Sequence, residues 1–397
     1  MAAIGELSGE LNVGSGVTIG DATRDADAVN LSSAARLVVE EHRAAPCAVV
    51  GAAQRSAGRW RLGWGAAGRL WSVPAGQAPP AHIQLLFDLA SLTKPVTALT
   101  LARCQREGLV DRAQPLGELL PELGDTASGR VPLDLLAAHR AGLEAHREFF
   151  TARTGAEQPS VAAVLAEAAD ARRPECGGAP PAEGFPPVYS DLGYILVGAA
   201  LASRAGRELD ALVQDQVARP LGLTLGSARQ LLRSEPNTAQ RLVPTEEVGW
   251  RGGVLRGVVH DENAWVLADR GSAGHAGMFG DIWSVVRLGT KVLDGLSGRR
   301  DDWLTATELE PLIRRRPGGS HCAGFDRRGS EAPMSGRHFG PETFGHLGFT
   351  GTSLWIDPDQ QLVGVLLTNR VHPTRDSTAI RTARPAAYDR IHERMTA

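Results

Sequence analysis

We expect an α+β fold in which one antiparallel sheet, flanked by N- and C-terminal helices as an α/β/α sandwich, carries an inserted all-helical domain. Two observations predict it. Short apolar or alternating runs, typical of strands, occur near both ends of the chain, at 47–53, 60–64, 349–356 and 362–368. Between them, from about 116 to 267, the pattern is mainly helical. The simplest architecture pairs the strands of both ends in one sheet, and a cleft beside the helical part is the natural place for a site.

The other elements follow in order along the chain. An amphipathic helix is expected at 31–43 and is stopped by Pro46, and a second helix begins at Ser91 and ends near Gly108. The remaining segments are helices at 161–169, 192–204 and 209–218, loops at 174–187 and 314–345, a turn at 357–360 between the last two strands, and a terminal helix from Pro385 through Met395.

These elements divide the chain into three expected parts. Residues 1–30 are polar and form an N-terminal arm. Residues 31–95 and 275–397 form a discontinuous α/β sheet domain, and residues 96–274 form the helical domain. A chain of 397 residues is long enough for such a composite core.

The composition is that of an ordinary globular protein, 43% hydrophobic and 22% charged. The net charge of -3 argues against a nucleic-acid partner, and the one compact basic run, 314–316, is interpreted as a solvated loop. Four scattered cysteines without a Cys-x-x-Cys pair predict reduced thiols, no metal and no cofactor. No apolar run approaches the ~20 residues of a membrane helix. Residues 1–21 lack the pattern of a signal peptide, so we expect a cytoplasmic protein with no membrane partner, of open oligomeric state.

The first motif with chemical content is Ser91-Leu92-Thr93-Lys94. A serine hydroxyl needs a base within hydrogen-bonding reach before it can act as a nucleophile. A lysine three residues later on a helix lies on the same face, so this spacing can place an amine beside the hydroxyl. A helix-capping serine followed by a solvated lysine is the alternative that these four residues leave open.

The second motif is Tyr189-Ser190-Asp191, between the Pro/Gly-rich loop and a helix. A phenol has a pKa of about 10, and we expect a lysine ammonium beside it to lower that pKa enough for Tyr189 to shuttle protons. The alternatives are an interface tyrosine bonded to a carbonyl and an aspartate that caps the helix.

The third motif is the stretch from His346 to Thr352, which contains Gly348 and Gly351 and is expected to open the first late strand. Glycines at a strand entrance let a ligand or another backbone approach closely. A strand edge that lines a cleft also offers N–H groups to an oxyanion. A structural histidine is the alternative for His346.

Taken in order, these three motifs resemble those of the serine β-lactamase and penicillin-binding-protein superfamily, in particular the class C β-lactamase-like serine hydrolases and esterases. The similarity extends from about residue 31 to the C-terminus. Further stretches that look like this group are Leu135–Leu143, Val259–Ala264, Gly274–Phe279 and Thr350–Trp355. The resemblance implies a β-lactamase/transpeptidase-like fold.

The resemblance also implies a role for each matching residue. Ser91 would be the acylated nucleophile, Lys94 would hold a proton position beside it, and Tyr189 would be the general base for acylation. His346 would occupy the place usually held by lysine or histidine at the sheet edge. The oxyanion hole would use the backbone N–H groups of Ser91 and of Phe349, the residue after the His346–Gly348 triplet.

Two positions depart from the family pattern. Asp191 replaces the usual asparagine, and its carboxylate would keep Lys94 charged, which favours Tyr189 as the base. Leu347 replaces a small hydroxyl residue, which weakens the case for binding a penicillin-type carboxylate. Both changes favour an esterase or amidase over a true β-lactamase.

Two polar features outside the motifs are interpreted as structural. The cluster 260–262 would brace the cleft wall, with activation of a deacylating water as the alternative. A metal site at His275 is rejected because no second ligand stands at a suitable spacing.

The expected function is hydrolysis of small esters or amides through an acyl-serine intermediate. Acyl transfer to an alcohol or amine would use the same intermediate. A true β-lactamase, a D-amino-acid peptidase and a catalytically silent binding protein are three further candidate functions. Peptidoglycan is disfavoured by the expected cytoplasmic location.

Overall fold

The computed structural model describes residues 28–72, 77–150, 160–234, 237–268, 271–299, 303–329 and 331–397. Its centre is a seven-stranded sheet in the order β1-β3-β2-β12-β11-β10-β9, and every neighbouring pair is antiparallel except β1 with β3. The strands are β1 (Val29–Asn30), β2 (Cys47–Ser56), β3 (Arg59–Gly68), β9 (Asp326–Arg327), β10 (Phe344–Leu347), β11 (Ser353–Asp357) and β12 (Leu362–Thr368). Of the predicted arm, residues 1–27 lie outside the described residues.

The two ends of the chain meet in this sheet through β2 and β12. Their pairing runs from Ala48 opposite Thr368 to Gln54 opposite Leu362. Both strands are buried along most of their length, which explains why they form continuous apolar runs rather than alternating patterns. The prediction of one sheet built from both ends is confirmed.

Helices cover both faces of the sheet. On one face, α1 (Ser32–Arg36), extended by a π turn at Leu37–Glu41, packs beside α14 (Ile380–Thr396). On the other face, α12 (Ile282–Leu296) packs against β2, β11 and β12. This three-layer arrangement matches the predicted α/β/α sandwich.

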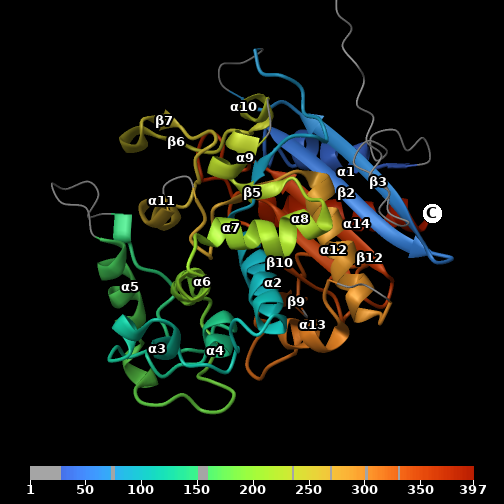
Figure 1. Ribbon diagram of the computed structural model, residues 1–397. Helices are drawn as coiled ribbons and strands as arrows, with labels where there is room; N and C mark the ends of the chain where they lie inside the picture. The colour runs from blue at the N-terminus through green and yellow to red at the C-terminus, as the bar shows by residue number, and fades with distance from the viewer. Residues whose placement is uncertain are drawn as a thin grey trace, which may run out of the picture.

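Most of the remaining helices lie to one side of the sheet, and α2 (Thr93–Arg106) runs between them and the sheet (Figure 1). The remaining helices are α3 (Leu116–Leu119), α4 (Leu133–Ala137), α5 (Val161–Asp170), α6 (Asp191–Ala205), α7 (Leu209–Val213), α8 (Arg219–Leu221), α9 (Ala228–Ser234), α10 (Thr238–Arg241), α11 (Glu262–Ala268) and α13 (Ala306–Ile313). As an exception, α13 packs against α12. Two small sheets pair β4 (Phe87–Asp88) and β5 (Leu225–Ser227) with β8 (Met278–Gly280), and β6 (Glu247–Val248) with β7 (Gly253–Val254). None of the described helices is long and apolar enough to cross a membrane.

Three sequence expectations differ from the structure. The strand expected at 349–356 begins only at Ser353, because the residues before it form a turn, and His346 lies on a separate strand, β10. The terminal helix begins at Ile380, so that Pro385 lies inside it. The mainly helical middle also contains short strands, which sequence periodicity does not resolve at two or three residues. The domain boundaries stay a prediction.

A test of this packing concerns Gly65 on β3. A Cβ built at Gly65 would lie 2.3 Å from the backbone carbon of Leu31, which leads into α1. Gly65→Ala is therefore expected to lower the free energy of unfolding by about 1–3 kcal/mol, as overpacking does. Urea unfolding measures it, with Gly177→Ala as the control because nothing lies within 4 Å of a Cβ there. Equal stabilities of the two variants would contradict this packing.

Candidate active site

Ser91 lies in a 3₁₀ turn, Ala90–Leu92, that leads directly into α2. Ala90 has a φ of +48°, a left-handed conformation that residues with a Cβ rarely adopt. Its N–H donates to Oδ1 of the buried Asp88 at 2.8 Å, and Oδ2 accepts the His260 N–H at 2.7 Å. This carboxylate therefore stabilises the strained backbone that precedes Ser91.

Lys94 is fully buried one turn after Ser91, which excludes the solvated lysine considered from the sequence. Its Nζ lies 3.0 Å from Ser91 Oγ, 2.7 Å from Asp191 Oδ1 and 3.4 Å from the His275 carbonyl oxygen. Three acceptors match the three N–H donors of an ammonium group. Burial lowers the pKa of Lys94, but the charge of Asp191 and the hydrogen bonds with Asp191 and Tyr189 raise it by more, so the pKa lies above its usual value and the side chain is charged.

Tyr189 meets this pair from the loop that leads into α6. Its ring centre lies 4.7 Å from Lys94 Nζ, and its hydroxyl interacts with both Lys94 and Ser91. The Lys94 ammonium does lower the pKa of Tyr189, as expected, but the predicted net fall of that pKa is wrong. Desolvation raises that pKa by more than Lys94 and the hydrogen bonds lower it, so the phenol is protonated at neutral pH.

Asp191 is the first residue of α6, and Ser190 holds the N-cap position. The carboxylate of Asp191 binds Lys94 through Oδ1, while Oδ2 lies 3.4 Å from His146 Nδ1. Burial raises the pKa of Asp191, but Lys94 and His146 lower it by more, so it lies below its usual value. Asp191 thus compensates the buried charge of Lys94 rather than capping the helix.

His346 approaches Tyr189 from the sheet edge, with 6.0 Å between the two ring centres. It is buried, and its Nδ1 donates to the Leu347 carbonyl oxygen at 2.9 Å. Burial lowers the pKa of His346 more than Asp326 raises it. A neutral ring with Nδ1–H leaves a lone pair on Nε2.

The turn that follows His346 is fixed against the Ser91 segment. Thr350 Oγ1 donates to the Asp88 carbonyl oxygen at 2.8 Å, and Thr352 Oγ1 donates to that of Leu89 at 3.0 Å. The Gly348 N–H donates to the Thr352 carbonyl oxygen at 2.7 Å, so this N–H is not available for an oxyanion. Gly348 contributes space instead, since a Cβ there would lie 2.8 Å from the Leu89 carbonyl oxygen. Phe349 is 49% exposed on this turn.

His139 lies in the Leu135–Leu143 stretch that resembles the family, but no role is predicted for it from the sequence. Its ring centre lies 4.7 Å from that of Tyr189, and its Nδ1 accepts the Ser190 N–H at 3.0 Å. Burial lowers the pKa of His139 to about 3, so the ring stays neutral. His321, bonded to Asp326 at 2.6 Å, packs against both rings. No sequence spacing signals this cluster, because His139, Tyr189 and His321 come from segments far apart in the chain.

A stability prediction follows for His139. Below pH 6.5 the unfolded chain binds a proton that the folded ring does not, so stability falls as pH drops from 6.5 towards 3, by at most about 1.4 kcal/mol per pH unit. His139→Asn keeps an acceptor for Ser190 and suits the φ of +60° at this position. Urea unfolding at pH 7 and pH 5 is expected to show a weaker pH dependence in this variant. The exposed His338→Asn is the control, and unchanged pH dependence in His139→Asn would contradict the prediction.

The cluster 260–262 and His275 brace the site from outside. His260 Nε2 lies 2.8 Å from Glu246 Oε2, and Glu262 pairs with Arg375 at 2.5 Å. Asp261 lies 2.8 Å from His275 Nε2, and the His275 carbonyl oxygen reaches Lys94. These side chains are engaged with one another, which fits the structural interpretation.

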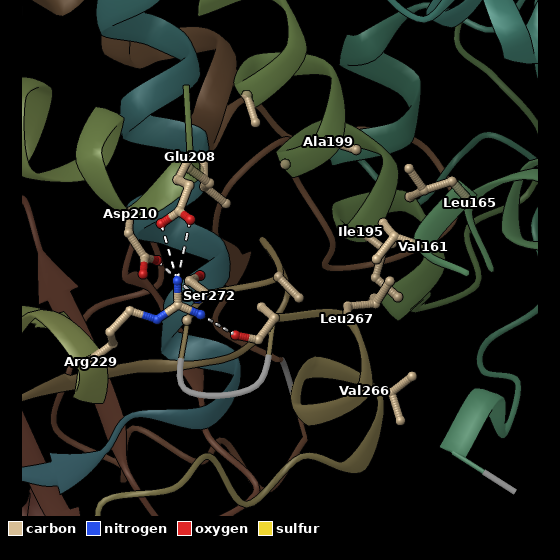
Figure 2. Close-up of a pocket in the computed structure, with 16 residues that line it drawn as sticks. Val161, Leu165, Ile195, Ala199, Glu208, Asp210, Arg229, Val266, Leu267 and Ser272 are labelled. Atoms are coloured by element: carbon tan, nitrogen blue, oxygen red, sulfur yellow. Dashed lines mark hydrogen bonds and ion pairs between the residues drawn. The ribbon is translucent and has the colours of Figure 1, made fainter. Parts of the chain in front are cut away.

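A cavity of about 520 Å³ lies beside α6, but it contains none of these site residues (Figure 2). Aliphatic side chains such as Ile195 and Leu267 line most of it. At its polar end, Arg229 is neutralised by Glu208, with both oxygens at 3.3 Å, and donates to the Ala268 carbonyl oxygen. Asp210 is likewise bonded to Ser227 and to the Ser272 N–H. The charged groups that line this cavity thus already have ion-pair or hydrogen-bond partners.

Comparison with known proteins identifies the class that this fold and site define. The model of the family described as Beta-lactamase matches residues 35–388, so the chain belongs to the Beta-lactamase family. A relative from Escherichia coli (strain K12), named "Putative D-alanyl-D-alanine carboxypeptidase", is 30% identical over 340 residues, covering 79% of this chain and 76% of the relative.

Solved structures show the same fold. The structure described as SurE with D-Leu is 26% identical, with a TM-score of 0.63 over 94% of this chain and 75% of that one. A class C β-lactamase from Rhodobacter sphaeroides is 18% identical, with a TM-score of 0.65 over 92% of this chain and 99% of that one. The expected superfamily and fold are confirmed.

Proposed function

We propose that this protein is a serine acyl hydrolase that cleaves small esters or amides through an acyl-Ser91 intermediate. One observation carries the proposal: Ser91 Oγ lies 3.0 Å from the buried ammonium of Lys94 and interacts with the hydroxyl of Tyr189. A serine becomes a nucleophile when its proton has a path away and its developing charge is stabilised. The roles of the site residues below are part of this proposal.

The proton path begins as Ser91 Oγ bonds to the substrate carbonyl carbon. Because the Tyr189 phenol is already protonated, it takes the Ser91 proton while passing its own to Nε2 of neutral His346. The Lys94 ammonium donates to Ser91 Oγ and stabilises negative charge along this path. The proton then returns to the leaving alcohol or amine. Water repeats the sequence to release the acid and restore Ser91.

The carbonyl oxygen would gain negative charge as the tetrahedral intermediate forms. The N–H groups of Ser91 and Phe349 are proposed to stabilise it. Two hydrogen bonds, from Thr350 and Thr352, hold the Phe349 turn against the segment that carries Ser91. Pre-organised donors of this kind need no rearrangement during the reaction.

The pH dependence of hydrolysis tests the part given to His346. His346 must be neutral to accept a proton, and burial lowers its pKa below the usual value of about 6.5. We expect kcat/KM to stay level as pH falls through 6.5 and to decline only at lower pH. A stopped-flow or plate-based pH profile with a p-nitrophenyl ester measures this. An acid limb at or above pH 6.5 would contradict it.

A second candidate is cleavage of peptides that end in a D-amino acid. It is favoured by the name of the 30% identical relative and by the D-Leu in the 26% identical structure. Acyl transfer is the other route open to an acyl-serine intermediate, in which an alcohol or amine replaces water.

One substrate panel separates these functions. It contains p-nitrophenyl esters, anilides, a chromogenic cephalosporin and a D-Ala-D-Ala peptide, each with and without an added alcohol or amine acceptor. Ester or anilide hydrolysis supports the proposal, peptide cleavage supports the second candidate, and a new acylated acceptor indicates transfer. No turnover of any substrate would contradict a hydrolase.

A further inference from the structure

A second cavity, of about 440 Å³, lies between α4, the end of α13 with the loop after it, and the 180–182 segment. Three arginines line it, Arg112, Arg314 and Arg316, with Asp134 as its one acidic lining residue. The other walls are mainly apolar: Ala113, Pro132, Leu135, Pro180, Pro181, Ala182 and Pro311. The basic run at 314–316, interpreted from the sequence as a solvated loop, therefore contributes to a cavity, and Arg316 is only 6% exposed.

The positive charges here exceed the negative ones. Asp134 forms ion pairs with two guanidinium groups. Arg316 Nη2 lies 2.6 Å from Asp134 Oδ2, and Arg112 Nη1 lies 3.4 Å from Asp134 Oδ1. Arg314 pairs with Glu183, and both of these side chains are about half exposed. The Nε of buried Arg316 has no hydrogen-bond partner among the described residues. A buried guanidinium with incomplete pairing is costly unless something else compensates it.

A fourth arginine increases the imbalance. Arg140, directly after His139, is buried, and its partners are the carbonyl oxygens of Glu183, Phe185 and Pro317. Burial lowers the pKa of Arg140, and the charge of Arg316 lowers it further. The exposed Asp111 accepts the Ala113 N–H, and its negative charge raises the pKa of Arg112. The four arginines of this group still outnumber its three carboxylates, Asp111, Asp134 and Glu183. By contrast, Arg229 in the cavity of Figure 2 is fully paired.

We propose that this cavity binds a phosphate monoester, with Arg112, Arg314 and Arg316 contacting the phosphate. A phosphate monoester carries about two negative charges at neutral pH and offers three strong acceptor oxygens, which suits several converging guanidinium groups. A carboxylate would supply a single charge. The proline and alanine walls suit the organic part of the ester. The proposal does not depend on the hydrolase activity.

The site borders the proposed active site through one segment. Residues 317–321 run from the cavity to His321, which packs against Tyr189. On the way, Gly319 passes so close to Pro187 that a Cβ there would lie 3.1 Å from the proline ring. A ligand held by Arg316 would thus lie at the start of the segment that ends beside the Tyr189 ring.

The test is binding of glycerol 2-phosphate to the full chain by isothermal titration calorimetry at constant ionic strength, with acetate as the comparison. We expect saturable one-to-one binding of the phosphate ester and far weaker binding of acetate. Arg112→Gln and Arg314→Gln are each expected to weaken it about tenfold, since each removes a charge-assisted contact. Asp134→Asn is expected to strengthen it by removing the competing carboxylate. Arg229→Gln, the control at the paired arginine, is expected to change nothing.

Each of three results would overturn the proposal: no saturable binding, acetate binding as tightly as the phosphate ester, or equal weakening by Arg229→Gln. Thermal unfolding and circular dichroism establish that each variant is folded. Should Arg112→Gln not fold, Arg314→Gln decides the question, because its side chain is 44% exposed and its loss removes no buried pair.

Discussion

Replacing Ser91 with alanine is expected to abolish turnover of p-nitrophenyl esters while leaving the fold unchanged. The hydroxyl is the only group removed, and the acyl-enzyme cannot form without it. Loss of the nucleophile in an enzyme with a concerted site costs on the order of 10⁴-fold or more in kcat. Steady-state kinetics of Ser91→Ala measure the loss of turnover, and circular dichroism of the same variant measures whether the fold is unchanged.

The control is Ser203→Ala, at an exposed serine near the C-terminal end of α6, which is expected to keep full activity. Activity of Ser91→Ala within about tenfold of the parent would remove Ser91 as the nucleophile. Loss of activity together with loss of the folded state would leave stability as the cause, and the unfolding curve of each variant distinguishes these results.

Tyr189→Phe is expected to reduce kcat by about 10² to 10⁴-fold, the usual contribution of a positioned proton-transfer group. The Tyr189 hydroxyl contacts both Ser91 and Lys94, and its removal breaks the path by which the Ser91 proton leaves. The change is expected in kcat more than in KM, because the lost interaction acts in the transition state. Initial-rate kinetics over a range of ester concentrations measure both constants.

Tyr194→Phe is the matched control. Tyr194 is a buried tyrosine whose ring centre lies 5.8 Å from Lys94 Nζ, but it lies within α6, whereas Tyr189 precedes that helix. It is expected to keep nearly parental kcat. A mild effect of Tyr189→Phe, no larger than that of Tyr194→Phe, would transfer the base role to Lys94 and require its amine to be neutral.

The local part of this site could be predicted from the sequence because helix geometry relates residues three apart. Lys94 reaches Ser91 within one turn, and that spacing is visible in the chain. The Lys94–Asp191 contact spans 97 positions, so only the resemblance to a family could place it. The same resemblance put His346 at the sheet edge, and the structure has it on β10 with its ring near that of Tyr189, on another strand than the expected one.

The features that were missed depend on burial, which sequence does not report. The pKa of Tyr189 reflects a balance between desolvation and the charge of Lys94, and the stronger effect was not visible in the motif. The basic run predicts a solvated side chain for Arg316, but Arg316 is buried against Asp134, which lies 182 positions away in the chain. His139 acquires its neutral state from the same cause.

The most direct measurement is the mass of the intact protein after treatment with a fluorophosphonate probe, followed by peptide mapping. A nucleophilic serine displaces fluoride and forms a phosphonyl ester, which adds one phosphonyl group to the protein mass. We predict a single adduct on Ser91, absent from Ser91→Ala and slower to form in Tyr189→Phe. A protein that gains no adduct, or gains it equally in Ser91→Ala, would contradict covalent chemistry at this serine.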